Sequence, residues 1–343
     1  MKKMTSLAAA SALALSVGAT TAQAADSITV ASWGGSYQDA QRKAMFEPTA
    51  KDLGITVNEA TLSSLADVRV QVRSGAVEWD VVDLGATDCA IGAREGLFEP
   101  LDYTVIQAEG IDDKMVKDHW IGVIYYSTVP AWNTKTVDKP PQNWADFWNV
   151  EAFPGLRSMR NRPQVMLEMA LLADGVKPAE LYPLDVDRAF KKMEEIKPHI
   201  ATWWESGAQS VQLAKDGEVD MIAAWDGRLD SAIKDGAAID FTYNQGLLNA
   251  DCLAVPKGAP NKELAMQAIA KFVSPEQQAE ITKHISYGPV NTKAFDTGRI
   301  SEEAAQKINT APQNMDKQVV VDADWWGEHG ARMRERWDSM IQR

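Results

Sequence analysis

The chain has 343 residues, which is enough for two lobes of ordinary domain size. Its formal net charge of −13 argues against a nucleic-acid partner, because binding to phosphates needs clustered lysines and arginines. The sequence also lacks a Walker loop, a GxGxxG motif, a GxSxG nucleophile elbow and an HExxH motif. Catalysis therefore has no support in the sequence, and we expect no enzymatic activity, no cofactor and no metal ion.

The first 24 residues have the features of a secretory signal peptide. Lys2 and Lys3 form a positive n-region, residues 7–18 are apolar, and residues 22–24 read Ala-Gln-Ala, which fits a signal-peptidase site. The apolar run is shorter than the roughly 20 residues that span a bilayer, so a membrane anchor is the less favoured alternative. We expect cleavage near Ala24 and export to the periplasm as a soluble monomer.

The cysteines and histidines do not form a metal-binding pattern. Cys89 and Cys252 lack the CxxC and Cys/His spacings of a zinc site, and the four histidines are far apart. In an oxidising compartment a single disulfide is possible, although the sequence alone does not decide whether the two cysteines pair.

Strand-like apolar runs alternate with helical patterns in the first third of the chain. The predicted strands are 28–32, 56–59, 81–84 and 121–127. The predicted helices are 37–53, 65–74 and 89–95. This order predicts an α/β lobe with a largely parallel sheet, in which ligands bind beyond the carboxyl ends of the strands.

The same alternation continues to the end of the chain. Predicted helices are 144–148, 164–173, 185–197 and 211–216, predicted strands are 221–225 and 252–255, and the tail 301–343 is mostly helical. No flexible linker separates two halves, so we expect ordered crossings at 126–133 and 249–255. The prediction is one lobe of residues 25–128 and 253–300, a second lobe of residues 129–252 and 301–343, and a cleft between them.

Tryptophans are unusually frequent, and several stand where a predicted strand ends. The chain has 12 tryptophans, and those at such positions are Trp33, the pair Trp203-Trp204, and Trp225. An indole there is well placed for a cleft wall, although packing in a lobe core is the alternative. Asp226 follows Trp225, and a ring face beside a carboxylate suits an ammonium group. Asp226 could also cap a helix that starts at Gly227.

Five segments in order resemble the extracellular solute-binding proteins of polyamine-type ABC importers, the spermidine/putrescine-binding group. They read ITVASWGGSYQDAQRKAMFEP, VVDLGATD, GEVDMIAAWDGR, DCLAVPKGAPNKELAMQAIAKFVSPEQQAE and SYGPVN. The resemblance implies a two-lobed periplasmic-binding fold of type II. Such a protein closes on its ligand by hinge motion and then docks on a permease in the inner membrane.

The resemblance also implies a set of ligand-binding residues. Trp33 should lie against the ligand, Asp251 falls where the family has an amine-binding carboxylate, and one of Tyr125 and Tyr126 should turn into the cleft. The other positions carried over by motif are Thr87, Asp88, Trp225, Asp226 and Tyr287.

One segment departs from the polyamine-binding pattern. Where those proteins have a pair of acidic residues, this chain reads RSMRNRPQVML, with Arg160, Asn161 and Arg162. Arginine would repel a second ammonium group but would grip a carboxylate or a sulfonate. The alternative is that both arginines face solvent.

The expected ligand is therefore a small amine-bearing solute, either a zwitterionic amino compound or a short polyamine. Some relatives in the family bind γ-aminobutyrate, which fits the arginines. Two alternatives stay open. The first is a quaternary ammonium such as betaine or choline, with Trp203 and Trp204 in an aromatic box. The second is a sensor subunit for an amine such as γ-aminobutyrate.

Overall fold

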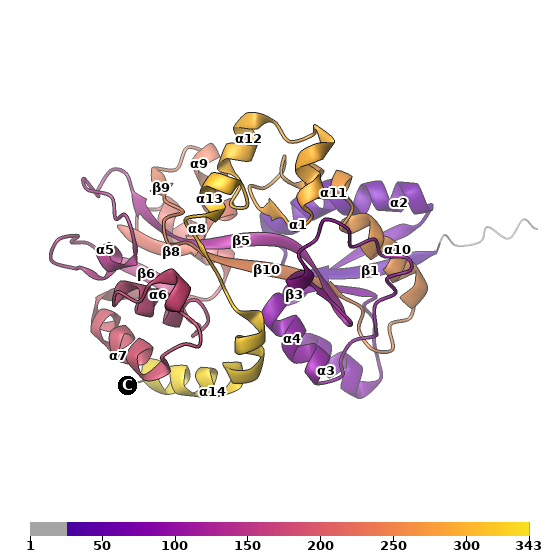
Figure 1. Ribbon diagram of the computed structural model, residues 1–343, viewed down its shortest axis with the longest axis horizontal. Coiled ribbons are helices and arrows are strands. Elements are labelled where there is room, and N and C mark those ends of the chain that lie inside the picture. The colour runs from indigo at the N-terminus through magenta and orange to yellow at the C-terminus, as the bar shows by residue number, and fades with distance from the viewer. Residues whose placement is uncertain (1–25, 343) are drawn as a thin grey trace, which may run out of the picture.

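The computed structural model describes residues 26–342, in which strands and helices alternate (Figure 1). The predicted signal peptide, 1–24, lies outside the described residues. The strands are β1 (Ser27–Ser32), β2 (Thr56–Thr61), β3 (Val81–Gly85), β4 (Val116–Lys117), β5 (Trp120–Asn133), β6 (Arg157–Arg160), β7 (Ile200–Trp204), β8 (Met221–Trp225), β9 (Ile239–Phe241), β10 (Leu247–Ala254), β11 (Gly288–Pro289) and β12 (Val319–Val320).

The α-helices cover this sheet. They are α1 (Gly35–Gln41), α2 (Glu47–Leu53), α3 (Leu65–Ser74), α4 (Ala86–Arg94), α5 (Trp144–Trp148), α6 (Met166–Ala173), α7 (Val186–Ile196), α8 (Gly207–Lys215), α9 (Asp226–Lys234), α10 (Lys262–Phe272), α11 (Pro275–Ile281), α12 (Glu302–Lys307), α13 (Pro312–Met315) and α14 (Ala323–Gln342). Within residues 26–342, none of them is both long and apolar enough to cross a membrane.

The sheet consists of two parallel blocks joined by antiparallel strands. Its main order is β2-β1-β3-β10-β5-β8-β6-β7. Strands β1, β2 and β3 are parallel at one end, and β6, β7 and β8 are parallel at the other. The central strands β10 and β5 are antiparallel to each other and to their outer neighbours, β3 and β8. The predicted α/β architecture is therefore confirmed, and its parallel regions are the ends of the sheet.

The buried apolar side chains form separate cores on the two sides of the central strands. One cluster takes residues from 28–125 and 248–290, and we call this part the first lobe. Two further clusters take residues from 129–247 and 319–340, and they form the second lobe. Strands β5 and β10 contribute to both sides and run next to each other between the lobes (Figure 1). The predicted lobe boundaries at residues 128 and 252 fall within these two strands.

The C-terminal helix contacts both lobes. Gly327 of α14 lies against α4 of the first lobe, and a Cβ added there would come 3.2 Å from the Ala90 Cβ. Farther along α14, Met333 and Trp337 pack into the core of the second lobe. Helix α14 therefore bridges the two lobes.

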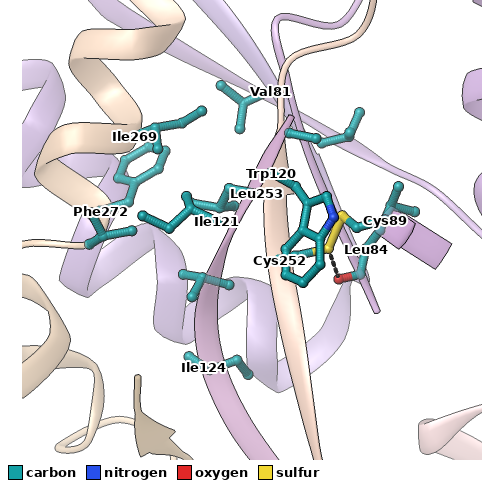
Figure 2. Close-up of a cluster of buried hydrophobic side chains, with 14 of the residues drawn as sticks. Val81, Leu84, Cys89, Trp120, Ile121, Ile124, Cys252, Leu253, Ile269 and Phe272 are labelled. Atoms are coloured by element: carbon teal, nitrogen blue, oxygen red, sulfur yellow. Dashed lines mark hydrogen bonds between the residues drawn. A yellow bond between two sulfur atoms is a disulfide. The ribbon is translucent and has the colours of Figure 1, made fainter. Parts of the chain in front are cut away.

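The two cysteines form a disulfide inside the first lobe. Cys89 of α4 is bonded to Cys252 of β10, 163 residues farther along the chain. Figure 2 shows the bond within a buried cluster that includes Leu84 and Trp120. The disulfide that the sequence left open is thus present, and it joins a helix to a central strand.

Candidate functional site

A cavity of about 680 Å³ takes side chains from both lobes. Its lining includes Trp33 after β1, residues 85–88 at the end of β3 and the start of α4, Arg160 at the end of β6, and Trp225 at the end of β8. These are the carboxyl ends of parallel strands, where ligands bind in open α/β sheets. The volume lies within the ~300–1,000 Å³ range typical of small-molecule sites. The cavity is the candidate ligand site.

Eight of the ten predicted site residues line this cavity. They are Trp33, Thr87, Asp88, Tyr126, Arg160, Trp225, Asp251 and Tyr287. Tyr125 lines the cavity together with Tyr126, where only one of the two was expected to turn inward. Arg162 lines it with Arg160, so the alternative that both arginines face solvent does not hold.

The other two predicted residues do not line the cavity, and the first of these is Trp203. Its ring packs edge-on against Trp337 of α14, with the ring centroids 5.5 Å apart. Neighbouring side chains of a strand point to opposite faces, so the adjacent Trp204 is the one that lies beside the site. The Trp204 ring is 5.2 Å from that of Trp225. An aromatic box that includes Trp203 is therefore not present at this cavity.

The second is Asp226, which is buried away from the cavity. Its carboxylate accepts hydrogen bonds from the backbone N–H of Ser127 at 3.0 Å, from Asn309 Nδ2 at 2.9 Å and from the Tyr243 hydroxyl at 3.1 Å. Burial raises the pKa of Asp226 to about 7, and the hydrogen bond from Ser127 is the main effect in the opposite direction. Asp226 lies in the first turn of α9 rather than at its N-cap position, and its side chain links α9 to β5.

Trp225 holds two of the protein's own cations. The guanidinium carbon of Arg160 is 4.8 Å from the centroid of the Trp225 ring, and that of Arg228 is 5.6 Å away. Such contacts are favourable because the ring quadrupole attracts a cation. The indole therefore positions arginines, where the sequence predicted that it would receive the ammonium of a ligand.

Arg160 has a donor to offer a ligand. Burial, with Arg162 nearby, lowers the pKa of Arg160 to about 10, so the group stays charged at neutral pH. The buried Nε of Arg160 has no hydrogen-bond partner among the described residues, and the same is true of Arg228 Nε. A carboxylate next to Trp225 could accept hydrogen bonds from both guanidinium groups.

Two acidic residues face the same cavity from the first lobe. Asp251 lies on β10, and Asp88 lies in the first turn of α4. Burial raises the pKa of both carboxyls; Asp83 adds to the shift at Asp251, whereas Arg162 opposes it at Asp88. An ammonium group between such carboxylates would favour their charged forms.

Aromatic rings enclose the acidic side of the cavity. Tyr287 packs against Tyr37 with 5.7 Å between ring centroids and against Tyr126 with 6.0 Å. The Tyr37 hydroxyl donates a hydrogen bond of 2.7 Å to Asp83, which lies behind the cavity wall. The rings give an apolar surface for the carbon chain of a ligand.

The charges in the cavity wall are balanced. The lining contains four arginines, Arg160, Arg162, Arg228 and Arg334, and four carboxylates, Asp88, Glu205, Asp251 and Asp338. The N-terminal residues of α4 and α8 also line the cavity, and a helix N-terminus favours an anion. The wall can therefore receive one positive and one negative group.

Several lining residues were missed at the sequence level. Arg228 follows Trp225 by three residues, a spacing that places both on one side of a helical turn and could have revealed it. Gln164 donates a 2.8 Å hydrogen bond to the Thr87 hydroxyl and so connects the two lobes across the site. Arg334 enters from α14, and no local pattern in the sequence points to it.

Two α/β lobes joined by central strands, with a polar and aromatic cavity between them, define an extracytoplasmic solute-binding protein. Residues 41–312 match the family described as bacterial extracellular solute-binding protein, and the chain belongs to this family. Its members are binding proteins, which agrees with the absence of catalytic motifs in the sequence.

Individual relatives are similar over nearly the whole chain. A γ-aminobutyric acid-binding protein of Pseudomonas aeruginosa is 36% identical, over 92% of this chain and 91% of its own length. A spermidine/putrescine-binding periplasmic protein of Escherichia coli is 24% identical, over 95% and 93%. The crystal structure of an ABC transporter substrate-binding protein from Bradyrhizobium japonicum is 46% identical, with a TM-score of 0.89 over 92% of this chain and all of that one. The predicted resemblance and the predicted two-lobed fold are confirmed.

Proposed function

We propose that this protein is the periplasmic solute-binding component of an ABC importer, and that its ligand is a small zwitterion of the γ-aminobutyrate type. The observation that carries the proposal is the balanced cavity wall, with Arg160 and Arg228 on Trp225 and with Asp251 on the opposite lobe. The ligand carboxylate binds the two arginines. Its ammonium group binds Asp251, with Asp88 nearby.

The charge pattern favours a zwitterion over a diamine. A diamine has two positive ends, and the end that reaches Arg160 and Arg228 would be repelled. The identities to two relatives also favour a zwitterion. The relative named for γ-aminobutyric acid is 36% identical to this chain, and the one named for spermidine and putrescine is 24% identical. Tyr37, Tyr126 and Tyr287 contact the methylene chain.

In the proposed transport cycle, the open lobes take up the solute and then close over it. The hinge consists of β5 and β10, which are the central strands that connect the lobes. The hydrogen bond from Gln164 to Thr87 forms when the lobes meet. The closed protein then docks on the permease, which receives the solute. The protein carries out no chemical reaction on the ligand.

Calorimetry on the refolded, ligand-free protein tests the ligand class. We expect γ-aminobutyrate to bind at least tenfold more tightly than putrescine, which lacks the carboxylate, and than butyrate, which lacks the amine. Arg160→Met should weaken γ-aminobutyrate binding by about 10- to 100-fold, because a hydrogen bond to a charged group contributes ~1.5–3 kcal/mol. Asp251→Asn should cause a similar loss.

A surface arginine serves as the control. Arg188→Met removes a guanidinium that pairs with Asp174 on the outside of the second lobe, at 2.6 Å, and it should leave the affinity unchanged. Putrescine binding as tight as that of γ-aminobutyrate, or Arg160→Met without effect, would contradict the zwitterion assignment.

A further inference from the structure

The Cys89–Cys252 disulfide stands directly beside the two acidic residues of the cavity. Asp88 precedes Cys89 in α4, and Asp251 precedes Cys252 in β10. Both aspartates line the cavity, whereas both cysteines are fully buried in the core of the first lobe. Figure 2 shows the sulfur atoms among apolar side chains, next to Leu84 at the end of β3. One covalent bond thus connects the backbone segments that carry both carboxylates.

The backbone around Asp251 is irregular. Strand β10 pairs with β3 so that Asp251 is opposite Gly85 and Cys252 is opposite Leu84. On its other side, the pairing of β10 with β5 shifts register between Asp251 and Cys252. Such a bulge redirects a side chain and disrupts the ladder of hydrogen bonds. The direction of the Asp251 side chain is therefore not set by regular strand pairing alone.

The helix that carries Asp88 begins without a side-chain cap. Gly85 is the N-cap residue of α4 and has no side chain, so no capping side chain accepts a hydrogen bond from the backbone N–H groups of the first turn. Cys89 lies in the first turns of this helix, so its bond to Cys252 ties the start of α4 to β10. Leu84 also contacts the bond, since its carbonyl oxygen lies 3.1 Å from Cys252 Sγ.

The two carboxylates have little other support in the described part of the chain. Burial disfavours the charge of both groups; at Asp251 the charge of Asp83 adds to this effect, and nearby arginines oppose it at both groups. Neither carboxylate accepts a hydrogen bond from another part of residues 26–342 that would hold it in place. In the ligand-free protein, the positions of the two carboxylates therefore depend on the backbone segments that carry them.

We propose that the Cys89–Cys252 disulfide is a positioning element of the binding site, which fixes Asp88 and Asp251 at the spacing that an ammonium group requires. The two cysteines act through the aspartates and touch no ligand. The inference rests on the proposed function for the choice of ammonium-bearing ligand. Hydrogen exchange of the ligand-free proteins, which needs no ligand, distinguishes a failure of this inference from a failure of the proposed function.

The test compares C89A/C252A with the wild type and with Ile269→Ala. Ile269 lies in α10, in the core of the same lobe (Figure 2), so its truncation destabilises this lobe without touching the cavity. Affinity for γ-aminobutyrate is measured by calorimetry well below the melting temperature of each variant. Amide hydrogen exchange of residues 85–89 and 249–252 is measured on the ligand-free proteins. The pair C89V/C252A, checked by circular dichroism, replaces the first pair if C89A/C252A does not fold.

We expect the cysteine variant to bind γ-aminobutyrate at least tenfold more weakly, and the two segments to exchange at least tenfold faster. Ile269→Ala should bind within twofold of the wild type despite its lower melting temperature. A cysteine variant that loses thermal stability but binds within twofold of the wild type would overturn the inference. If the wild type does not bind γ-aminobutyrate, the proposed ligand is wrong, and unchanged exchange at both segments would overturn the positioning role as well.

Discussion

Trp225 shows how one aromatic residue can organise the charge of a binding site. Arg160 and Arg228 both lie over its ring, and Tyr126 contacts its edge with 5.8 Å between centroids. A desolvated cation–π contact can contribute about 2 kcal/mol, which offsets part of the cost of burying a guanidinium. The arginines are thereby held ready for an anion before the ligand arrives.

Asp226, the neighbour of Trp225, should act on stability rather than on binding. Asp226→Ala leaves the backbone N–H of Ser127 and the amide of Asn309 without this acceptor, so we expect a loss of about 2–4 kcal/mol in the free energy of unfolding. Asp226→Asn keeps one carbonyl oxygen as an acceptor and should lose less. Thermal unfolding measures the loss of stability in both variants. Calorimetry should show that both bind the ligand with an affinity within threefold of the wild type. A large loss of affinity at unchanged stability would place Asp226 in the binding site after all.

Among the elements, the start of α8 packs closely on Arg228 and Trp225 in the cavity wall. A Cβ added at Gly207 would lie 2.5 Å from Arg228 Nε and 2.7 Å from a carbon of the Trp225 ring. Only glycine leaves room for both groups at this point. The first turn of α8 thus limits where Trp225 and Arg228 can lie.

Gly207→Ala should therefore weaken ligand binding by about tenfold while the fold remains intact. Alanine has a higher helix propensity than glycine by about 1 kcal/mol, which offsets the cost of the close contacts of the added methyl group. The free energy of unfolding should therefore change little. Gly330→Ala in α14 is the matched control, because its Cβ would meet only ordinary contacts at 3.9 Å and 4.0 Å. Calorimetry and thermal unfolding on both variants give the comparison. Equal affinities for the two variants would mean that the cavity adapts to the added methyl group.

Stability of the whole molecule should depend on three buried carboxyl groups. Burial raises the pKa of Asp83, Glu168 and Asp226 to about 7 each, from ordinary values of 3.8 for aspartate and 4.5 for glutamate. The folded state therefore keeps these protons at a pH where the unfolded state has lost them. Their contribution to stability is complete below about pH 4 and is lost as the pH rises to about 7.

We expect the melting temperature of the ligand-free protein to fall between pH 5 and pH 8, and Glu168→Gln to reduce this slope. The glutamine keeps a carbonyl oxygen for the hydroxyl of Tyr182 and for Trp326 Nε1, which both lie 2.5 Å from Glu168 Oε1. At pH 8 the variant should be more stable than the wild type, because it buries no charge. Differential scanning calorimetry across this range is the measurement. A melting temperature that rises with pH, or an unchanged slope in Glu168→Gln, would contradict the prediction.

The alternation of strands and helices could be predicted from the sequence, as could the family and eight of the residues that line the cavity. The alternation follows from local periodicity, whereas the family and most of these residues follow from the resemblance of short motifs to a known family. Residues at the carboxyl ends of parallel strands meet wherever the sheet forms. The export and the lobe boundaries predicted from the sequence remain predictions.

The folded structure was needed to tell which of two neighbouring side chains lies at or beside the site. Trp204 rather than Trp203 lies beside it, and Trp225 rather than Asp226 lines it, because strand register and helix phase set the direction of a side chain. The approach of Arg334 to the cavity and the bond between Cys89 and Cys252 were likewise beyond the sequence. Such contacts join segments that are far apart in the chain and meet only in the folded structure.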